Sequence, residues 1–245
     1  MDNKKEFLST INHEIRTPLT SIKGFAETIL SSYDKLSDEQ KKKFINIIKE
    51  QSIRLINLVE NALNAADSDV DYNNLVFKKT DINEILLKSI DVVKVNYKNF
   101  IFEKNLSNGL FSSLDKDALE QIFINILDNA CKYSNNSNKV EIKTYFKDNK
   151  NYISIKNFGE IIEDCEKEKI FDKFYRTQTY LTSKVQGSGL GLFIVKTLIS
   201  KMNGEIQVNS NKKEKSVEFL IGLPVFILED FTKLSHKNLK RSQNV

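Results

Sequence analysis

The segment at residues 11–20 reads Ile11-Asn12-His13-Glu14-Ile15-Arg16-Thr17-Pro18-Leu19-Thr20. Apolar residues recur around it every three or four positions, which predicts an amphipathic helix with a stripe of Leu8, Ile11, Ile15, Leu19, Ile22, Phe25 and Ile29. His13 lies off this stripe, so we expect its imidazole to face water, with Glu14 beside it and Thr17 one turn further along. An exposed imidazole next to a carboxylate suits a nucleophile, because the carboxylate can take a proton from one ring nitrogen while the other attacks. Taken alone, a His–Glu pair is more often an ordinary surface feature.

Composition limits the class of protein. The chain has 245 residues, 40% of them hydrophobic and 29% charged, which predicts a folded protein of one large or two small domains. The net charge of +4 is small and the lysines are scattered, so we expect no nucleic-acid partner. Cys131 and Cys165 lie far apart without metal-ligand spacing, which fits a reducing compartment. The longest apolar run is about ten residues, too short for a membrane span, so we expect a cytoplasmic chain without membrane contact of its own.

Two amphipathic helices open the chain. The first is predicted at about 3–32, and a short connection leads to Ser37, which with Gln40 has the spacing of a capping box. The second helix carries apolar residues at helical spacing: Phe44, Ile47, Ile48, Leu55, Leu58, Val59 and Ala62. Each helix has an apolar stripe too wide for one partner helix to cover, which favours a two-fold four-helix bundle. The alternative is a monomeric hairpin packed on the rest of the chain.

A polar stretch at 67–74 marks a domain boundary. Beyond it the pattern is mixed, with Asp81 and Glu84 beginning a helix that ends near 97, Asp115 beginning another, and a third at 193–202 that Gly204 ends. Strands are predicted at 75–77, 100–106, 110–113, 139–146, 152–157, 205–209 and 216–223.

The helix after Asp115 has a polar side. Asn125, Asn129 and Lys132 follow at i, i+4 and i+7, offering amide oxygens to a hard cation and a positive charge to a phosphate. Such a row is more often a plain solvated face. Further on, Gly187-Ser188-Gly189-Leu190-Gly191-Leu192 runs into a helix, an arrangement in which backbone amides can surround an anion. A dinucleotide fingerprint would need a strand just before these glycines, where the sequence reads as a loop.

Taken in order, these motifs resemble those of the sensor histidine kinases. Residues 7–25 resemble the H-box, with its pattern His-Glu-x-x-Thr-Pro, and residues 125–133 resemble the N-box. Residues 170–176 resemble the F-box, and residues 187–192 the second glycine box. The resemblance implies that His13 accepts a phosphoryl group, that Glu14 is the general base, and that Thr17 helps to position water when a partner is dephosphorylated.

The same resemblance implies an ATP site. Asn129 would ligate Mg²⁺ and Asn125 would support it, while the remaining contacts to the nucleotide would come from Lys132, Tyr133, Asn157, Gly159, Arg176, Gly187, Gly189, Leu190 and Gly191. One motif departs from the pattern: where the family has Asp-x-Gly-x-Gly, this chain has Asn157-Phe158-Gly159-Glu160-Ile161. An amide oxygen still accepts a hydrogen bond from the adenine amino group, although without a charge.

The sequence therefore predicts an α+β protein: a helical hairpin that forms a dimeric four-helix bundle, followed by an α/β sandwich. Residues 1–67 would be the dimerisation and phosphotransfer domain, 75–223 the catalytic ATP-binding domain, and 224–245 a tail of unknown role. The implied function is autophosphorylation of His13 from Mg-ATP and transfer to an aspartate of a response regulator receiver domain. The chain would be a homodimer in the cytoplasm, or the cytosolic part of a membrane-bound sensor. The alternatives are a kinase-inactive or phosphatase-dominant scaffold that binds a regulator, and a free-standing ATPase.

Overall fold

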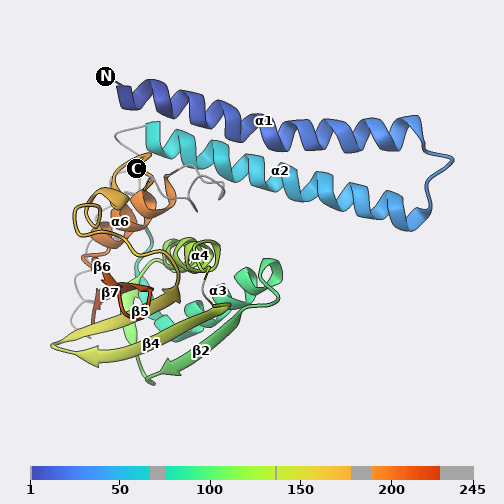
Figure 1. The fold of residues 1–245 in the computed structure, drawn as a ribbon. Helices are drawn as coiled ribbons and strands as arrows, with labels where there is room; N and C mark the ends of the chain where they lie inside the picture. The colour runs from blue at the N-terminus through green and yellow to red at the C-terminus, as the bar shows by residue number, and fades with distance from the viewer. Residues whose placement is uncertain (1, 67–74, 136, 178–188, 227–245) are drawn as a thin grey trace, which may run out of the picture.

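Two long antiparallel helices form the N-terminal part (Figure 1), in a computed structural model that describes residues 2–66, 75–135, 137–177 and 189–226. They are α1 (Asp2–Ser31) and α2 (Asp38–Ala66). The predicted capping box is present, because the Ser37 N–H donates to Gln40 Oε1 at 3.0 Å and the Gln40 N–H donates to Ser37 Oγ at 3.2 Å. These reciprocal bonds begin α2 where the sequence predicted, so the hairpin is confirmed.

The hairpin leaves much apolar surface exposed. The helices contact each other through half-buried side chains, and the rings of Phe25 and Phe44 lie 5.2 Å apart. Other large apolar side chains of the hairpin are at least 39% exposed: Leu19, Leu30, Ile45, Ile53, Ile56 and Val59. In the part of the chain that the structure describes, no other element buries them, which argues against a hairpin that is packed on the rest of the chain.

A mixed sheet covered by helices on one face forms the second part (Figure 1). The sheet has the order β2-β4-β5-β7-β6, in which β2 and β4 are parallel and the other neighbours antiparallel. Its strands are β2 (Ile101–Leu106), β4 (Lys139–Lys147), β5 (Lys150–Phe158), β6 (Glu205–Asn211) and β7 (Ser216–Pro224). A separate antiparallel pair is made by β1 (Lys78–Asp81) and β3 (Phe111–Leu114).

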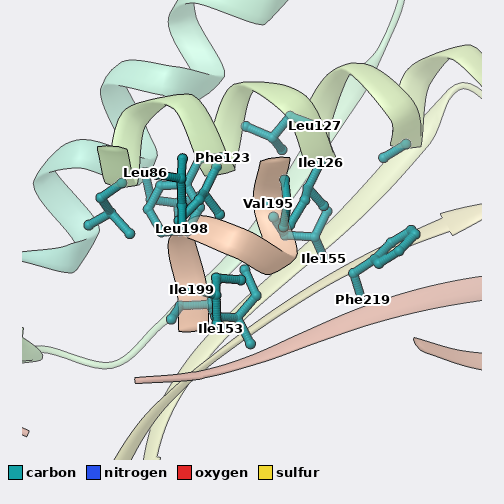
Figure 2. Close-up of a cluster of buried hydrophobic side chains, with 14 of the residues drawn as sticks. Leu86, Phe123, Ile126, Leu127, Ile153, Ile155, Val195, Leu198, Ile199 and Phe219 are labelled. Carbon is teal, nitrogen blue, oxygen red and sulfur yellow. The ribbon is translucent and has the colours of Figure 1, made fainter. Parts of the chain in front are cut away.

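The covering helices are α3 (Ile82–Asn96), α4 (Lys116–Lys132) and α6 (Gly191–Lys201), with a short 3-10 helix at Lys169–Phe171. Asp81 and Asp115 cap α3 and α4 as the sequence predicted. Asp81 accepts from the Asn83 N–H at 2.9 Å, and Asp115 accepts from the Ala118 N–H at 2.9 Å. Figure 2 shows apolar side chains of α4 and α6 packed against those of β5 and β7. Phe123 and Ile126 of α4, Val195 and Leu198 of α6, and Ile153 of β5 are at most 1% exposed.

Two local predictions were wrong. The strand expected at 75–77 is not formed; the chain pairs three residues later, where Lys78 to Asp81 lie opposite Leu114 to Phe111. Non-local pairing with β3 sets this register, and the apolar Leu75 and Phe77 pack on the core instead. The residue that ends α6 in a left-handed conformation is Asn203, with φ 56°, and not Gly204.

Gly204 has another role at this point in the chain. A Cβ there would lie 2.9 Å from the Gly222 carbonyl oxygen, so a glycine is needed for the close approach of two backbones.

Several predicted features lie outside the described residues: the boundary at 67–74, most of the loop after the F-box, and the tail beyond 226. Within the described ranges, no helix is both long and apolar enough to cross a lipid bilayer.

We predict that Phe123→Ala lowers the free energy of unfolding of the α/β part by about 3–5 kcal/mol, because it empties a fully buried site between helix and sheet. Urea denaturation followed by circular dichroism measures the change. The control Val92→Ala removes a side chain that is 45% exposed on α3, and should change stability by less than about 0.5 kcal/mol. Equal stability of the two variants would contradict the assigned core.

Candidate active site

The end of β5 and the C-terminal end of α4 are joined by backbone hydrogen bonding. Ser134 and Gly159 form an isolated β-bridge, and the Asn135 N–H donates to the Phe158 carbonyl at 3.2 Å. A Cβ on Gly159 would collide with the carbonyl oxygen of Tyr133. Glycine is therefore required at 159 because the backbone of Tyr133 approaches it closely.

Asn157 lies two residues before this contact, on the helix-covered side of the sheet. It is 3% exposed, and its neighbours in the adjoining strands are Val140 and Val217. Among the residues that the structure describes, none forms a hydrogen bond with its side-chain amide. The amide is not among the fully enclosed side-chain polar atoms that lack a hydrogen bond, so its end remains accessible from outside the chain, where a ligand could reach it.

The start of α6 lies against the polar side of α4. The Asn125 amide donates to the Gln121 carbonyl at 2.9 Å, and its Oδ1 lies 3.0 Å from the position of a Cβ on Gly191. Gly191 is the first residue of α6, so the amide oxygen of Asn125 lies beside the helix N-terminus, where backbone N–H groups are exposed.

The F-box contacts the glycines of the second glycine box. Gly189 has φ 71°, and a Cβ there would lie 2.8 Å from the backbone of Phe174. The Phe174 N–H donates to the Gly189 carbonyl at 3.0 Å, and Phe174 itself has φ 69°. Phe171 and Leu190 are buried beneath this contact. The F-box and the second glycine box are thus in contact, with a left-handed backbone conformation at Phe174 and at Gly189.

Lys132 is oriented by residues that the sequence analysis missed. Its Nζ lies 2.5 Å from Asp128 Oδ2, and the Tyr97 hydroxyl donates to Asp128 Oδ1 at 2.8 Å. Burial, followed by the charge of Asp128, raises the pKa of Tyr97 well above its usual range, and the same two causes raise that of Cys131 to about 12. Both groups therefore stay protonated at neutral pH. The i, i+4 spacing could have revealed Asp128, but no sequence signal points to Tyr97 from α3.

The other predicted residues are placed as follows. Asn129 is half-buried on α4, and no described residue forms a hydrogen bond with its side chain; Tyr133 is the C-cap of that helix. Arg176 is half-buried after the 3-10 helix. His13 and Glu14 lie within α1, and Thr17 is exposed on the same helix. The side chains of His13 and Glu14, and all of Gly187, lie outside the described structure.

The candidate ligand for a divalent cation is the side-chain oxygen of Asn129. Among the described residues, no three His, Cys, Asp or Glu side chains are grouped to hold a metal. The Asn129 oxygen is a hard ligand of the kind that Mg²⁺ accepts, and Mg²⁺ commonly completes its shell with substrate phosphates and water. The residues present therefore fit a cation that arrives with a phosphorylated ligand.

We predict that Gly159→Ala destabilises the α/β part by about 1–3 kcal/mol, because the new methyl group forces the ends of α4 and β5 apart. Differential scanning calorimetry measures this. In the control Gly24→Ala, the Cβ meets nothing within 4 Å on a helix, so the hairpin should gain roughly 0.5–1 kcal/mol. A Gly159→Ala chain as stable as the native one would contradict the backbone contact.

Two family models match the chain. The His Kinase A (phospho-acceptor) domain matches residues 3–70, and the histidine kinase-, DNA gyrase B- and HSP90-like ATPase matches residues 114–226. Sensor protein kinase WalK of Staphylococcus saprophyticus is 33% identical over 230 residues, which are 93% of this chain and 37% of that protein. A WalK of Staphylococcus aureus is 32% identical over 232 residues, 93% of this chain and 55% of that protein. The chain thus spans between about a third and about half of the length of these relatives.

Solved structures agree. Histidine kinase ThkA, in complex with response regulator protein TrrA, aligns with a TM-score of 0.62 and 27% identity over 90% of this chain and 61% of that one. Full-length ShkA in complex with AMPPNP aligns with a TM-score of 0.64 over 90% of this chain and 46% of that one, and at 24% identity it supports the fold alone. The motifs, the helical hairpin, the mixed sheet and both family models agree: the chain belongs to the sensor histidine kinase family.

Proposed function

We propose that the chain is a histidine kinase catalytic core that transfers the γ-phosphoryl group of Mg-ATP to His13 and then to an aspartate of a response regulator. The observation that carries this proposal is that α4 contacts both other elements of the site. Its C-terminal end lies against the end of β5 beside Asn157, and its Asn125, earlier on the same helix, lies against the start of α6. Along α4 they bring together an amide that no described residue hydrogen-bonds, a helix N-terminus and a lysine, which suits a base joined to a chain of phosphates.

Each group has a distinct task in this proposal. Asn157 binds the base. The N–H groups at the start of α6 and the ammonium of Lys132 bind phosphate oxygens, since an ammonium paired with Asp128 still has further protons to donate. Asn129 would hold Mg²⁺, which neutralises charge on the transferring group. Positioning and charge stabilisation supply most of the catalysis in phosphoryl transfer, so these contacts matter more than any proton donor.

The acceptor is His13 on α1. A ring nitrogen forms the new N–P bond while the bond to the ADP oxygen breaks, and Glu14 takes the proton from the other ring nitrogen. The phosphoryl group then passes to a receiver-domain aspartate; ThkA, which shares this fold, was solved with a response regulator. Thr17 is exposed on α1, where it can position the water that hydrolyses the aspartyl phosphate of the regulator and releases inorganic phosphate. We place this activity in the cytosol, as part of a longer membrane-bound sensor or alone.

One observation favours a second function. Asn157 and Ile161 replace an acid and a glycine of the family pattern, which would suit a kinase-inactive or phosphatase-dominant scaffold that binds a regulator. A measured affinity for Mg-ATP separates the two: the kinase requires binding and the inactive scaffold does not. A free-standing ATPase is disfavoured, because it has no need of the phospho-acceptor domain matched at residues 3–70.

We predict that the native chain incubated with γ-labelled Mg-ATP acquires a label that is lost in acid, because phosphohistidine has a labile N–P bond. His13→Ala should remove the label. The chain has two histidines, so His236→Ala is the matched control and should keep it. A label that survives in His13→Ala would contradict the assigned acceptor, and ATP binding without any label would favour the scaffold.

We also propose that the hairpin dimerises through the exposed stripe of α2. At about 100° per residue, Val59, Ile45, Ile56 and Ile53 fall within an arc of about 120°, and all are at least 39% exposed. A second hairpin would bury them in a four-helix bundle, the arrangement typical of this family.

We predict that light scattering gives twice the chain mass of 28.3 kDa for the native protein. Ile56→Glu should give a monomer, because dimerisation would bury an unpaired carboxylate. Lys43→Gln changes the charge equally at an exposed position on another side of α2, and should remain dimeric. A dimeric Ile56→Glu chain would show that the interface lies elsewhere.

A further inference from the structure

Two buried asparagines on β5 differ in how their amides are held. Asn151 is 2% exposed, and its Nδ2 donates to the Phe111 carbonyl at 2.9 Å and to Ser112 Oγ at 3.1 Å. These bonds fix which end of the Asn151 amide is the donor. Asn157 projects from the same side of the strand, three alternations later, and is equally buried, yet none of the described residues hydrogen-bonds its amide. No hydrogen bond from the described chain therefore fixes whether Oδ1 or Nδ2 of Asn157 faces a ligand.

An amide without a fixed orientation offers either a donor or an acceptor. Rotation about the last side-chain bond exchanges Oδ1 and Nδ2, which are nearly equal in size. The strand neighbours of Asn157, Val140 and Val217, have apolar side chains, so neither orientation gains a polar contact from them. A carboxylate at this position would present acceptors only.

Purines differ in whether the group at position 6 donates or accepts a hydrogen bond. Adenine has an amino group there, which donates, whereas guanine and hypoxanthine have a carbonyl oxygen, which accepts. A buried carboxylate would face that carbonyl with acceptor against acceptor, and the missing hydrogen bond would exclude 6-oxopurines. The Asn157 amide can accept from a 6-amino group in one orientation and donate to a 6-oxo group in the other.

We infer that Asn157 is a specificity-determining residue that lets this kinase bind 6-oxopurine triphosphates as well as ATP. The inference rests on the proposed function, since it assumes that the base lies against Asn157. Inosine triphosphate is the sharpest probe, because it differs from ATP only on the base edge that carries position 6. Guanosine triphosphate adds an amino group at position 2 and tests whether the pocket admits it.

Titration calorimetry of the full chain with the Mg²⁺ complexes of ATP and inosine triphosphate tests this. We expect the native chain to bind the two within about three-fold of each other. Asn157→Asp should favour ATP by at least about ten-fold, because the carboxylate excludes the 6-oxo group. The control Asn105→Asp adds the same charge at an exposed position of β2 and should leave the native ratio unchanged.

Asn157→Leu provides a second test, because it removes the amide while keeping the volume. It should weaken both nucleotides and leave their ratio near one. A native chain that binds ATP but discriminates against inosine triphosphate by more than about ten-fold would overturn the inference and leave the kinase proposal standing. Unchanged binding of both nucleotides to Asn157→Leu would show that residue 157 does not contact the base. A native chain that binds no ATP would overturn the proposed function and this inference together.

Discussion

The carbonyl oxygen of Tyr133 occupies the space that a side chain at residue 159 would need. Because residue 159 is glycine, the last turn of α4 can lie directly against the end of β5, and the bridge from Ser134 to Gly159 fixes their relative position. Everything proposed for the nucleotide depends on this approach. It places the amide of Asn157, which belongs to the sheet, close to the helix that carries Asn129.

Helix α4 links the fold to the chemistry. Its apolar side includes the fully buried Phe123 and makes the core with β5 and α6, while its polar side carries the candidate ligands (Figure 2). The same packing that stabilises the domain therefore sets the direction of Lys132, which Asp128 and Tyr97 hold through an ion pair and a hydrogen bond. A substitution in the core would shift α4 and with it the side chains on its polar side, because close-packed interiors transmit displacements.

Local signals in the sequence were enough for most of the fold. The Ser37–Gln40 capping box and the cap at Asp115 depend on residues within one turn, so their spacing identified both helix starts. Features set by distant residues were not predictable. The register of β1 depends on β3, and Tyr97 reaches the site only because α3 packs on α4. The motifs predicted the site residues, but only the structure showed that no described residue hydrogen-bonds the amide of the buried Asn157.

We propose that the C-terminal half of α4, the end of β5 and the start of α6 form one nucleotide site. Hydrogen–deuterium exchange of the full chain with and without Mg-ATP tests it most directly, because a bound nucleotide slows the exchange of the amides that it covers or stabilises. We expect slower exchange at residues 125–135, 157–161 and 189–195, and no change at the turn between β4 and β5, which lies at the other end of those strands. Slower exchange confined to other segments, with these three unchanged, would contradict the assigned site.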